Sequence, residues 1–210
     1  MKTKKITALI LALIMLLSLC ACGSQNTAPT ATEAPAADTP AESEVPAAEP
    51  EEITITDMIG REGTVTPGSY KRVVCIGAGA LRMYSYIGDV SLLCGVEDID
   101  NTTLDERPKM FDSVARPYVL AFGDTFSTLP SCGVGGPNAQ AAEAEKILSC
   151  NPDIVISEYE DVDKENALQE QLGVPVVTLK AGPNGVFDDA FKNTMTMLGT
   201  IFCNEEKAEK

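Results

Sequence analysis

Two neighbouring polar side chains near the middle of the chain could grip a small ligand. Arg116, Pro117 and Tyr118 are consecutive, so a guanidinium lies close to a tyrosine ring and its hydroxyl. A guanidinium can bind a carboxylate through two parallel hydrogen bonds, and a tyrosine offers a flat apolar face with a polar tip. A surface ion pair beside a partly buried tyrosine is the alternative. Arg116 and Tyr118 are therefore candidate ligand contacts.

Backbone groups could contribute at the turn Gly77-Ala78-Gly79-Ala80, which links an apolar run to a segment with helical spacing. Free N–H groups at such a turn can hold an anionic group. The turn lacks the full GxGxxG pattern and no Walker lysine follows, so a nucleotide site is not expected. A tight strand–helix turn explains these glycines equally well. Tyr159 follows a second apolar run and could face a ligand, whereas Asp161 fits a helix N-terminus better.

The chain shows no catalytic signature. It has no histidine, which excludes a Cys/His zinc site and a histidine-based triad. Five cysteines lie beyond residue 53 without a CxxC pair, and an odd number cannot all pair within one chain. Cys75 and Cys94 sit in apolar runs and are expected in the core. We expect no enzyme and no cofactor. The net charge of −15 disfavours nucleic acid as a partner.

A different chemistry is indicated at Cys22. Lys2, Lys4 and Lys5 precede the apolar run 6–19, and Ala21 stands directly before Cys22. That run is shorter than the roughly 20 residues of a spanning helix. The order predicts a signal peptide over 1–21, with lipid attached to the Cys22 thiol after cleavage. Cleavage without lipidation is the alternative, and Cys20 is a poorer acceptor because Leu19 precedes it. The mature protein should be held by lipid on the extracytoplasmic face of a bacterial cell membrane.

Residues 22–52 have the composition of a linker. Beyond Cys22 they are mainly Ala, Pro, Thr, Ser and Glu, with seven acids and no base. Such a segment cannot bury enough apolar surface to offset its ordering entropy, so we expect a disordered acidic tether.

The remaining residues alternate between strand and helix patterns. Strands are expected at 53–56, 64–66, 72–77, 90–96, 154–157 and 174–179, and helices at 80–87, 139–150, 162–172 and 187–203. This order predicts an α/β fold whose parallel sheet has helices on both faces and binds ligands at the carboxyl ends of its strands. The segment 97–126 is long for a loop and should carry a function or local structure of its own.

Two stretches resemble a known family. Arg72–Gly77 (RVVCIG) and Glu145–Ile156 (EKILSCNPDIVI) are similar to the substrate-binding lipoproteins of ABC importers for iron complexes and cobalamin. The hairpin expected over 53–65 also fits, and 198–208 looks like the start of the helix that joins two lobes. The resemblance covers nearly all of 53–210.

The resemblance implies a two-lobed periplasmic-binding-protein fold. Residues 53–188 would form the parallel-sheet N-terminal lobe, and 189–210 the start of the interlobe helix. The ligand would be a metal chelate (ferric siderophore, haem or cobalamin), delivered to a membrane permease that a cytoplasmic ATPase drives. Absence of histidine favours a chelate over a free metal ion. The carried-over contacts are Ala78, Gly79, Ala80, Arg116, Tyr118, Gly135, Gly136 and Tyr159.

One departure from the family is the length. Members continue for roughly another domain, about 100–150 residues. We therefore expect a fragment, a truncated and non-functional half-receptor, or a natural single lobe, which would bind weakly because one face of the ligand stays in water. A helix face made by Phe191, Met195, Leu198 and Phe202 would then be exposed. The competing hypotheses are a surface-anchored interaction protein without a small ligand and an exported enzyme on a flavodoxin-like sheet.

Overall fold

The computed structural model describes residues 51–110, 112, 115–136, 139, 141–180 and 188–210. These residues belong to one compact unit, Ala47–Lys210. The predicted signal peptide, Cys22 and nearly all of the linker lie outside the described residues. No helix in the described part is both long and apolar enough to cross a membrane.

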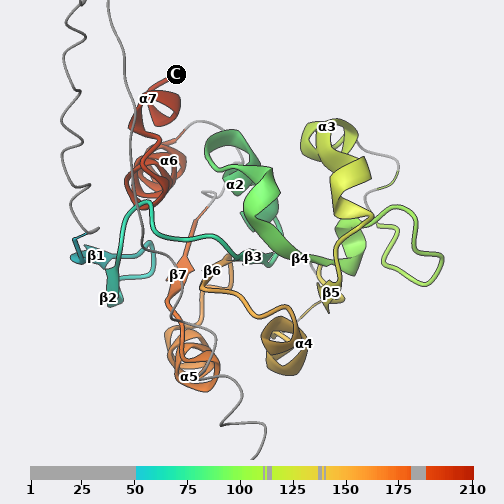
Figure 1. Ribbon diagram of the computed structural model, residues 1–210, viewed down its shortest axis with the longest axis horizontal. Helices are drawn as coiled ribbons and strands as arrows, with labels where there is room; N and C mark the ends of the chain where they lie inside the picture. The colour runs from blue at the N-terminus through green and yellow to red at the C-terminus, as the bar shows by residue number, and fades with distance from the viewer. Residues whose placement is uncertain (1–50, 111, 113–114, 137–138, 140, 181–187) are drawn as a thin grey trace, which may run out of the picture. The chain divides into compact units, whose positions relative to one another are not determined.

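The centre of the fold is a five-stranded, all-parallel sheet (Figure 1). Its order is β5-β4-β3-β6-β7, so the chain first builds outward from β3 and then returns to its other side. The strands are β3 (Val73–Ile76), β4 (Leu93–Glu97), β5 (Ser131–Gly133), β6 (Ile154–Ser157) and β7 (Val176–Thr178). The α/β prediction is confirmed, and the long apolar runs are explained by burial on both faces.

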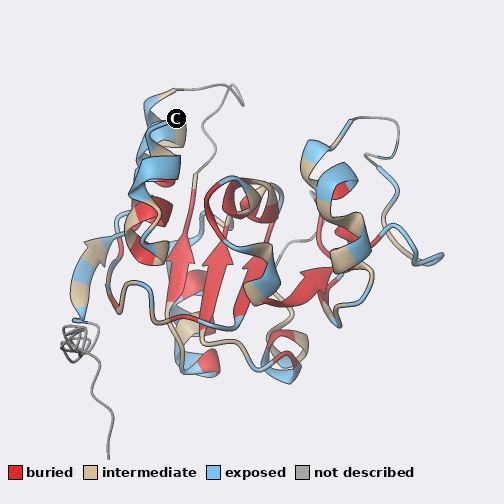
Figure 2. Ribbon diagram, turned by 45° about the horizontal axis from the view of Figure 1, so that its top comes forward, coloured by how far each residue is buried: buried red, intermediate tan, exposed pale blue. Residues whose placement is uncertain are grey.

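Helices cover both faces of this sheet (Figure 1). One core lies beneath α2 (Ala80–Ile87), α3 (Pro117–Phe126) and α6 (Asp189–Phe202), and the other beneath α4 (Ala144–Ser149) and α5 (Val162–Leu172). Alternate residues of β3 feed the two cores, since Val73 and Cys75 belong to the first and Val74 and Ile76 to the second. The strands are accordingly the most uniformly buried elements (Figure 2).

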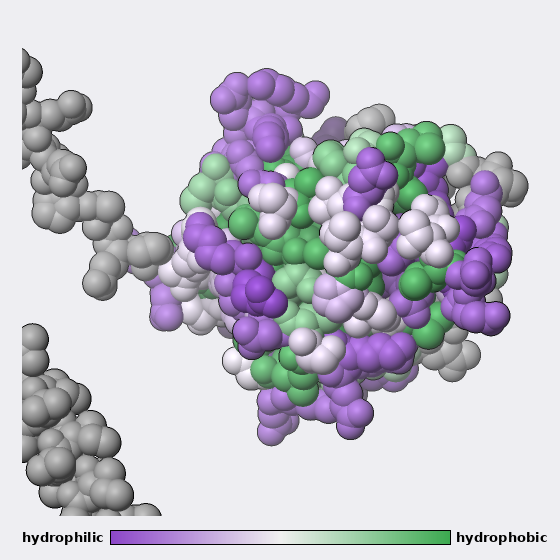
Figure 3. Space-filling model, turned by 45° about the vertical axis from the view of Figure 1, so that its right-hand side comes forward, coloured by the Kyte–Doolittle hydropathy of each residue, from purple (hydrophilic) through white to green (hydrophobic). Residues whose placement is uncertain are grey.

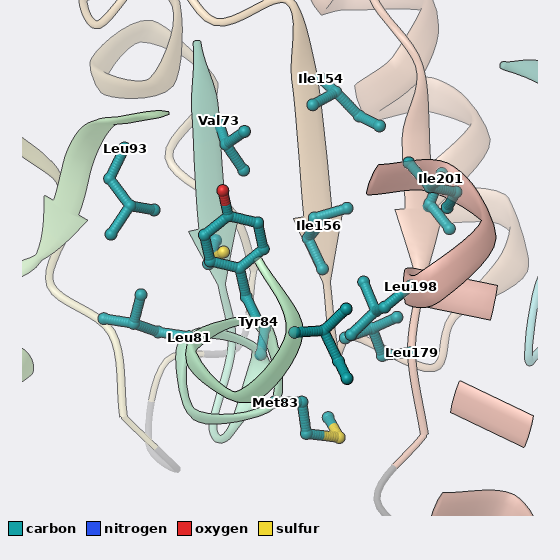
Figure 4. Packing of buried hydrophobic residues seen from close by; sticks show 14 of the residues in the cluster. Val73, Leu81, Met83, Tyr84, Leu93, Ile154, Ile156, Leu179, Leu198 and Ile201 are labelled. Atoms are coloured by element: carbon teal, nitrogen blue, oxygen red, sulfur yellow. The ribbon is translucent and has the colours of Figure 1, made fainter. Parts of the chain in front are cut away.

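Tyr84 lies at the centre of the first core (Figure 4). It is fully buried, and its hydroxyl donates a hydrogen bond of 2.8 Å to the carbonyl of Asp89. Its ring meets Phe202 edge-on with centroids 5.1 Å apart. The polar tip is thereby satisfied, and α2 is fixed to both the sheet and α6.

A separate antiparallel hairpin, β1 (Ile53–Thr56) with β2 (Glu62–Val65), packs beside the sheet. Arg61 attaches it to β7. Its Nε donates to Asp57 Oδ2 at 2.9 Å, and its Nη2 donates to the carbonyl of Val176 and to Thr178 Oγ1. The hairpin prediction is confirmed.

Several predicted elements differ from the observed ones. The irregular segment 97–126 contains a short 3-10 turn, Asp98–Asp100, and all of α3, and the three-residue strand β5 was not predicted. The helix expected over 139–150 begins only at Ala144, with Glu143 as its N-cap. The strand expected from Val90 begins at Leu93, because Val90–Leu92 form a 3-10 turn that Asp89 caps through Ser91 N–H.

Residues 189–210 contain two helices. Helix α6 ends at Phe202, Cys203 adopts a left-handed conformation (φ 51°), and α7 (Glu205–Ala208) packs back against α6. The expectation of an exposed apolar face on α6 is wrong. Met195 and Leu198 are buried in the first core, because this face of α6 packs on the sheet and on α2.

The α3 side of the molecule carries exposed apolar side chains. Leu104, Met110 and Leu120 are exposed, with Leu120 at 81%. Figure 3 turns this side forward and shows hydrophobic residues in the centre of the face with hydrophilic residues around them.

Candidate ligand-binding site at the carboxyl ends of β3 and β4

A hollow of about 300 Å³ opens above the carboxyl ends of β3 and β4. This is the edge at which parallel α/β sheets bind ligands. Eight of the residues that line it are Ala78, Gly79, Arg82, Glu97, Asp100, Arg116, Tyr118 and Gly136. Five of these are predicted contacts, so the fold brings together segments that are distant in sequence.

Asp100 organises the polar side of the hollow. It is only 6% exposed, and its Oδ1 accepts hydrogen bonds from Arg116 Nη1 and from the Tyr118 hydroxyl, both at 2.8 Å. Arg116 Nη1 also donates to the carbonyl of Ile99 at 3.1 Å. Burial raises the pKa of Asp100, while the Tyr118 hydrogen bond and the Arg116 charge oppose that rise. The charge of Arg116 is therefore balanced by Asp100. An ion pair of Arg116 beside a partly buried tyrosine was the alternative to ligand contact in the sequence analysis.

The glycine turn after β3 forms the floor of the hollow. Gly77 and Gly79 have φ values of 89° and 116°, a region that side chains disfavour. A Cβ on Gly79 would also lie 2.7 Å from Glu158 Oε2, so the Glu158 side chain would have to shift. The Gly77 N–H is already used, because it donates to Glu97 Oε1 at 3.1 Å. Ala80 does not line the hollow: its side chain is fully buried in the first core.

Glu97, the last residue of β4, is a buried carboxyl group at the base of the hollow. Burial raises its pKa to about 7; the Gly77 hydrogen bond lowers it, and the nearby charges of Asp100, Glu143 and Asp98 raise it further. Gly135 packs on this side chain, since a Cβ there would lie 2.6 Å from Glu97 Cβ. Gly135 therefore shapes the site without lining it.

Tyr159 lies apart from the other predicted contacts. It lines a second hollow of about 270 Å³ on the α5 side, together with Asp161 and Lys164, and packs against the second core. Asp161 caps α5 as expected, with its Oδ1 accepting the Lys164 N–H at 3.2 Å. The structure does not bring Tyr159 to the hollow above β3 and β4.

Sequence reasoning missed Arg82. This residue lines the hollow above β3 and β4 and also a groove of about 670 Å³ beside α2, α6 and α7. It is partly buried. A signal was available, because Arg82 is the one charged residue in Ala80–Ile87, directly after the glycine turn.

The cysteines of the described part are all unpaired. Cys75, Cys94, Cys132 and Cys150 are buried and Cys203 is exposed, so the core positions expected for Cys75 and Cys94 are confirmed. Burial raises the pKa of Cys94 to about 11. No group of three or more Cys, Asp or Glu side chains suited to a metal ion occurs among the described residues.

Solved structures share this fold at low sequence identity. The molybdate periplasmic binding protein MolA of Haemophilus influenzae is 16% identical (TM-score 0.55), covering 75% of this chain and 48% of its own. The petrobactin-binding protein YclQ of Bacillus subtilis is 19% identical (TM-score 0.53), covering 76% and 48%. The periplasmic catecholate-siderophore binding protein VctP of Vibrio cholerae is 21% identical (TM-score 0.51), covering 76% and 48%.

The chain spans about half the length of these proteins. No curated protein sequence matches it significantly. A family model described as "Periplasmic binding protein" matches residues 73–210. Because this match takes in the whole parallel sheet and well over half of the chain, the protein belongs to the periplasmic binding protein family.

Proposed function

We propose that this protein is the extracytoplasmic solute-binding component of an ABC importer, which captures an iron complex (ferric siderophore or haem) or a corrinoid. The observation that carries the proposal is the hollow above β3 and β4, where five predicted contacts meet on a periplasmic-binding-protein sheet. The chain catalyses nothing in this scheme. It delivers the ligand to a membrane permease, and a cytoplasmic ATPase supplies the energy.

The composition of the site supports a ligand recognised through an organic shell. The hollow combines two guanidinium groups, an aromatic ring and carboxyl groups with a glycine floor. The chain contains no histidine, the commonest protein ligand of transition metals. A chelated metal fits these groups better than a bare ion.

The domain organisation belongs to the same proposal. Residues 1–21 are the signal peptide, 22–52 the lipidated linker, 53–188 the N-terminal lobe, and 189–210 contain the start of the interlobe helix. A helix that leaves the lobe would begin at α7, because the left-handed Cys203 ends α6.

Thermal unfolding in the presence of chelates tests the ligand class. Ferric hydroxamate and catecholate siderophores, haemin and cobalamin are added separately, with the metal-free siderophores and protoporphyrin as controls. A ligand that binds the folded state at 100 times its Kd adds about 2.7 kcal/mol to the free energy of unfolding. We expect at least one chelate to raise the midpoint more than its metal-free form. A panel without any shift would contradict the proposal.

The lipid anchor has a test of its own. In bacterial cells the 210-residue chain should incorporate labelled fatty acid and partition into the detergent phase of Triton X-114. Cys22→Ala should abolish both, while Cys20→Ala, as a matched control, should abolish neither. Labelling that survives Cys22→Ala would place the anchor elsewhere.

A further inference from the structure

We propose that Arg82 is the ligand-binding cation of this hollow, and that the ligand is anionic and presents a carboxylate or a similar pair of oxygens to it. This inference rests on the proposed function and names the class of chelate that the site takes. Among ferric and corrinoid complexes, it selects those with peripheral acidic groups over neutral or cationic ones.

The pairing of the arginines points to Arg82. All five lie in the described part of the chain, and four are engaged: Arg61 with Asp57, Arg72 with main-chain carbonyls, Arg107 with Asp112, and Arg116 with Asp100. Among the five arginines, and within the described residues, Arg82 alone has neither a side-chain hydrogen bond nor an ion pair to a protein group. A partly buried cation loses hydration without compensation, so an external anion would be stabilised there.

The position of Arg82 supports the same inference. Arg82 stands three residues after Gly79 on α2 and lines both the hollow above β3 and β4 and the larger groove beside α6 and α7. An anionic group bound to Arg82 would thus lie where the two spaces meet. The body of a bulky chelate could then occupy one or both of them.

The acids of the hollow do not neutralise Arg82. Asp100 is bonded to Arg116 and Tyr118. Glu97 accepts the Gly77 N–H, and its burial keeps a substantial fraction protonated near neutral pH, since its pKa is about 7. The guanidinium of Arg82 is the charge that remains for a ligand.

The test compares chelates that differ in charge but little in shape. Haemin is paired with its dimethyl ester, which masks two carboxylates, and an anionic ferric tricatecholate with a neutral ferric trihydroxamate. Kd values are measured by fluorescence or absorbance titration for the wild-type chain, Arg82→Gln and Arg82→Lys. Lys164→Gln removes the same charge in the hollow that contains Tyr159 and is the matched control.

The wild-type chain should bind the anionic member of a pair about tenfold or more tightly than the neutral one, the effect of a charged hydrogen-bonded contact. Arg82→Gln should remove this preference, Arg82→Lys should keep part of it because the fork geometry is lost, and Lys164→Gln should leave it unchanged. All three variants should unfold at the wild-type temperature within about 2 °C, since neither side chain supports the core.

Two results would overturn the inference separately from the proposed function. Equal affinity for the anionic and neutral members, or a preference that survives in Arg82→Gln, contradicts the role of Arg82 while chelate binding stands. Absence of binding by every member of both pairs contradicts the proposed function and the inference together.

Discussion

At the scale of single residues, Asp100 holds the polar side of the site together. One of its oxygens accepts hydrogen bonds from both Arg116 and Tyr118, so this carboxyl group holds in place two side chains predicted to contact a ligand. A buried carboxylate with such partners becomes costly when a partner is removed, because the charge then lies in a poorly solvated place.

Arg116→Gln should therefore lower the free energy of unfolding by about 1–3 kcal/mol, the cost of a buried polar group that loses its partner. The pair is mostly buried, with side-chain exposures of 13% and 8%. Asp100→Asn combined with Arg116→Gln should cost less than the sum of the two single changes, because the uncompensated charge is gone. Denaturant titrations of the four proteins measure this, and strictly additive losses would show that the pair is not coupled.

Glu97 should make stability depend on pH. Its folded-state pKa of about 7 lies above the ordinary value of 4.5, so the folded state binds the proton more tightly. Its contribution is fully present below about pH 4.5 and is lost as the pH rises through about 7. Relative to wild type, Glu97→Gln should be equally stable in acid and more stable above neutrality, by about 1–3 kcal/mol.

Denaturant unfolding of both proteins over this pH range provides the measurement. Asp98, Asp100 and Glu143 are present in both chains, so the difference isolates Glu97. A constant difference across the range would mean that Glu97 titrates as an exposed carboxylate does.

At the scale of elements, the close packing of β4 against its neighbours depends on Gly95. A Cβ there would lie 2.6 Å from Cys150 Sγ and 3.2 Å from Cys132 Cβ. The residues of β5 and of the end of α4 therefore pack directly on β4 at a position that has no room for a side chain. Gly123 in α3 is the opposite case, because no atom outside its chain neighbours and the backbone of its own helix lies within 4 Å of its Cβ position.

The same substitution should thus have opposite effects at these two glycines. Gly95→Ala should destabilise by about 1–3 kcal/mol through overpacking, and Cys150→Ala should partly rescue it by removing the sulfur. Gly123→Ala should stabilise by about 0.5–1 kcal/mol, because alanine is the better residue within a helix. Thermal or denaturant unfolding measures the sign of both changes in the free energy of unfolding. If Gly95→Ala left this free energy unchanged, the Cys150 side chain would be able to move aside at little cost.

Among the strands of the parallel sheet, the sequence predicted those with continuous apolar runs and missed the one without such a run. Strands β3, β4, β6 and β7 were found because burial on both faces demands such runs. Strand β5 has only three residues, Ser-Cys-Gly, and its burial comes from β4 and α4 rather than from its own composition. Helix α3 contains Gly123 and begins at Pro117, so its pattern is weak.

The site was predictable to the same degree. The glycine turn could be found from its place after an apolar run, and Arg116 and Tyr118 from their residue types and their closeness in the sequence. The Arg116–Asp100 pair could not, because it joins two positions across an irregular segment. Arg82 stood out in the sequence as the one charged residue of α2, but its lack of a partner among the described residues is visible only in three dimensions.

At the scale of the whole molecule, the described residues form one α/β unit about half as long as the solved proteins that share its fold. The central claim is that a chelate binds at the hollow above β3 and β4, and not in the one that contains Tyr159.

Amide hydrogen exchange with and without the chelate that stabilises the protein most tests this claim directly. We expect added protection in peptides that cover 77–82, 97–100 and 115–118. Protection confined to residues 141–171, around Tyr159, or no added protection in any peptide, would contradict it.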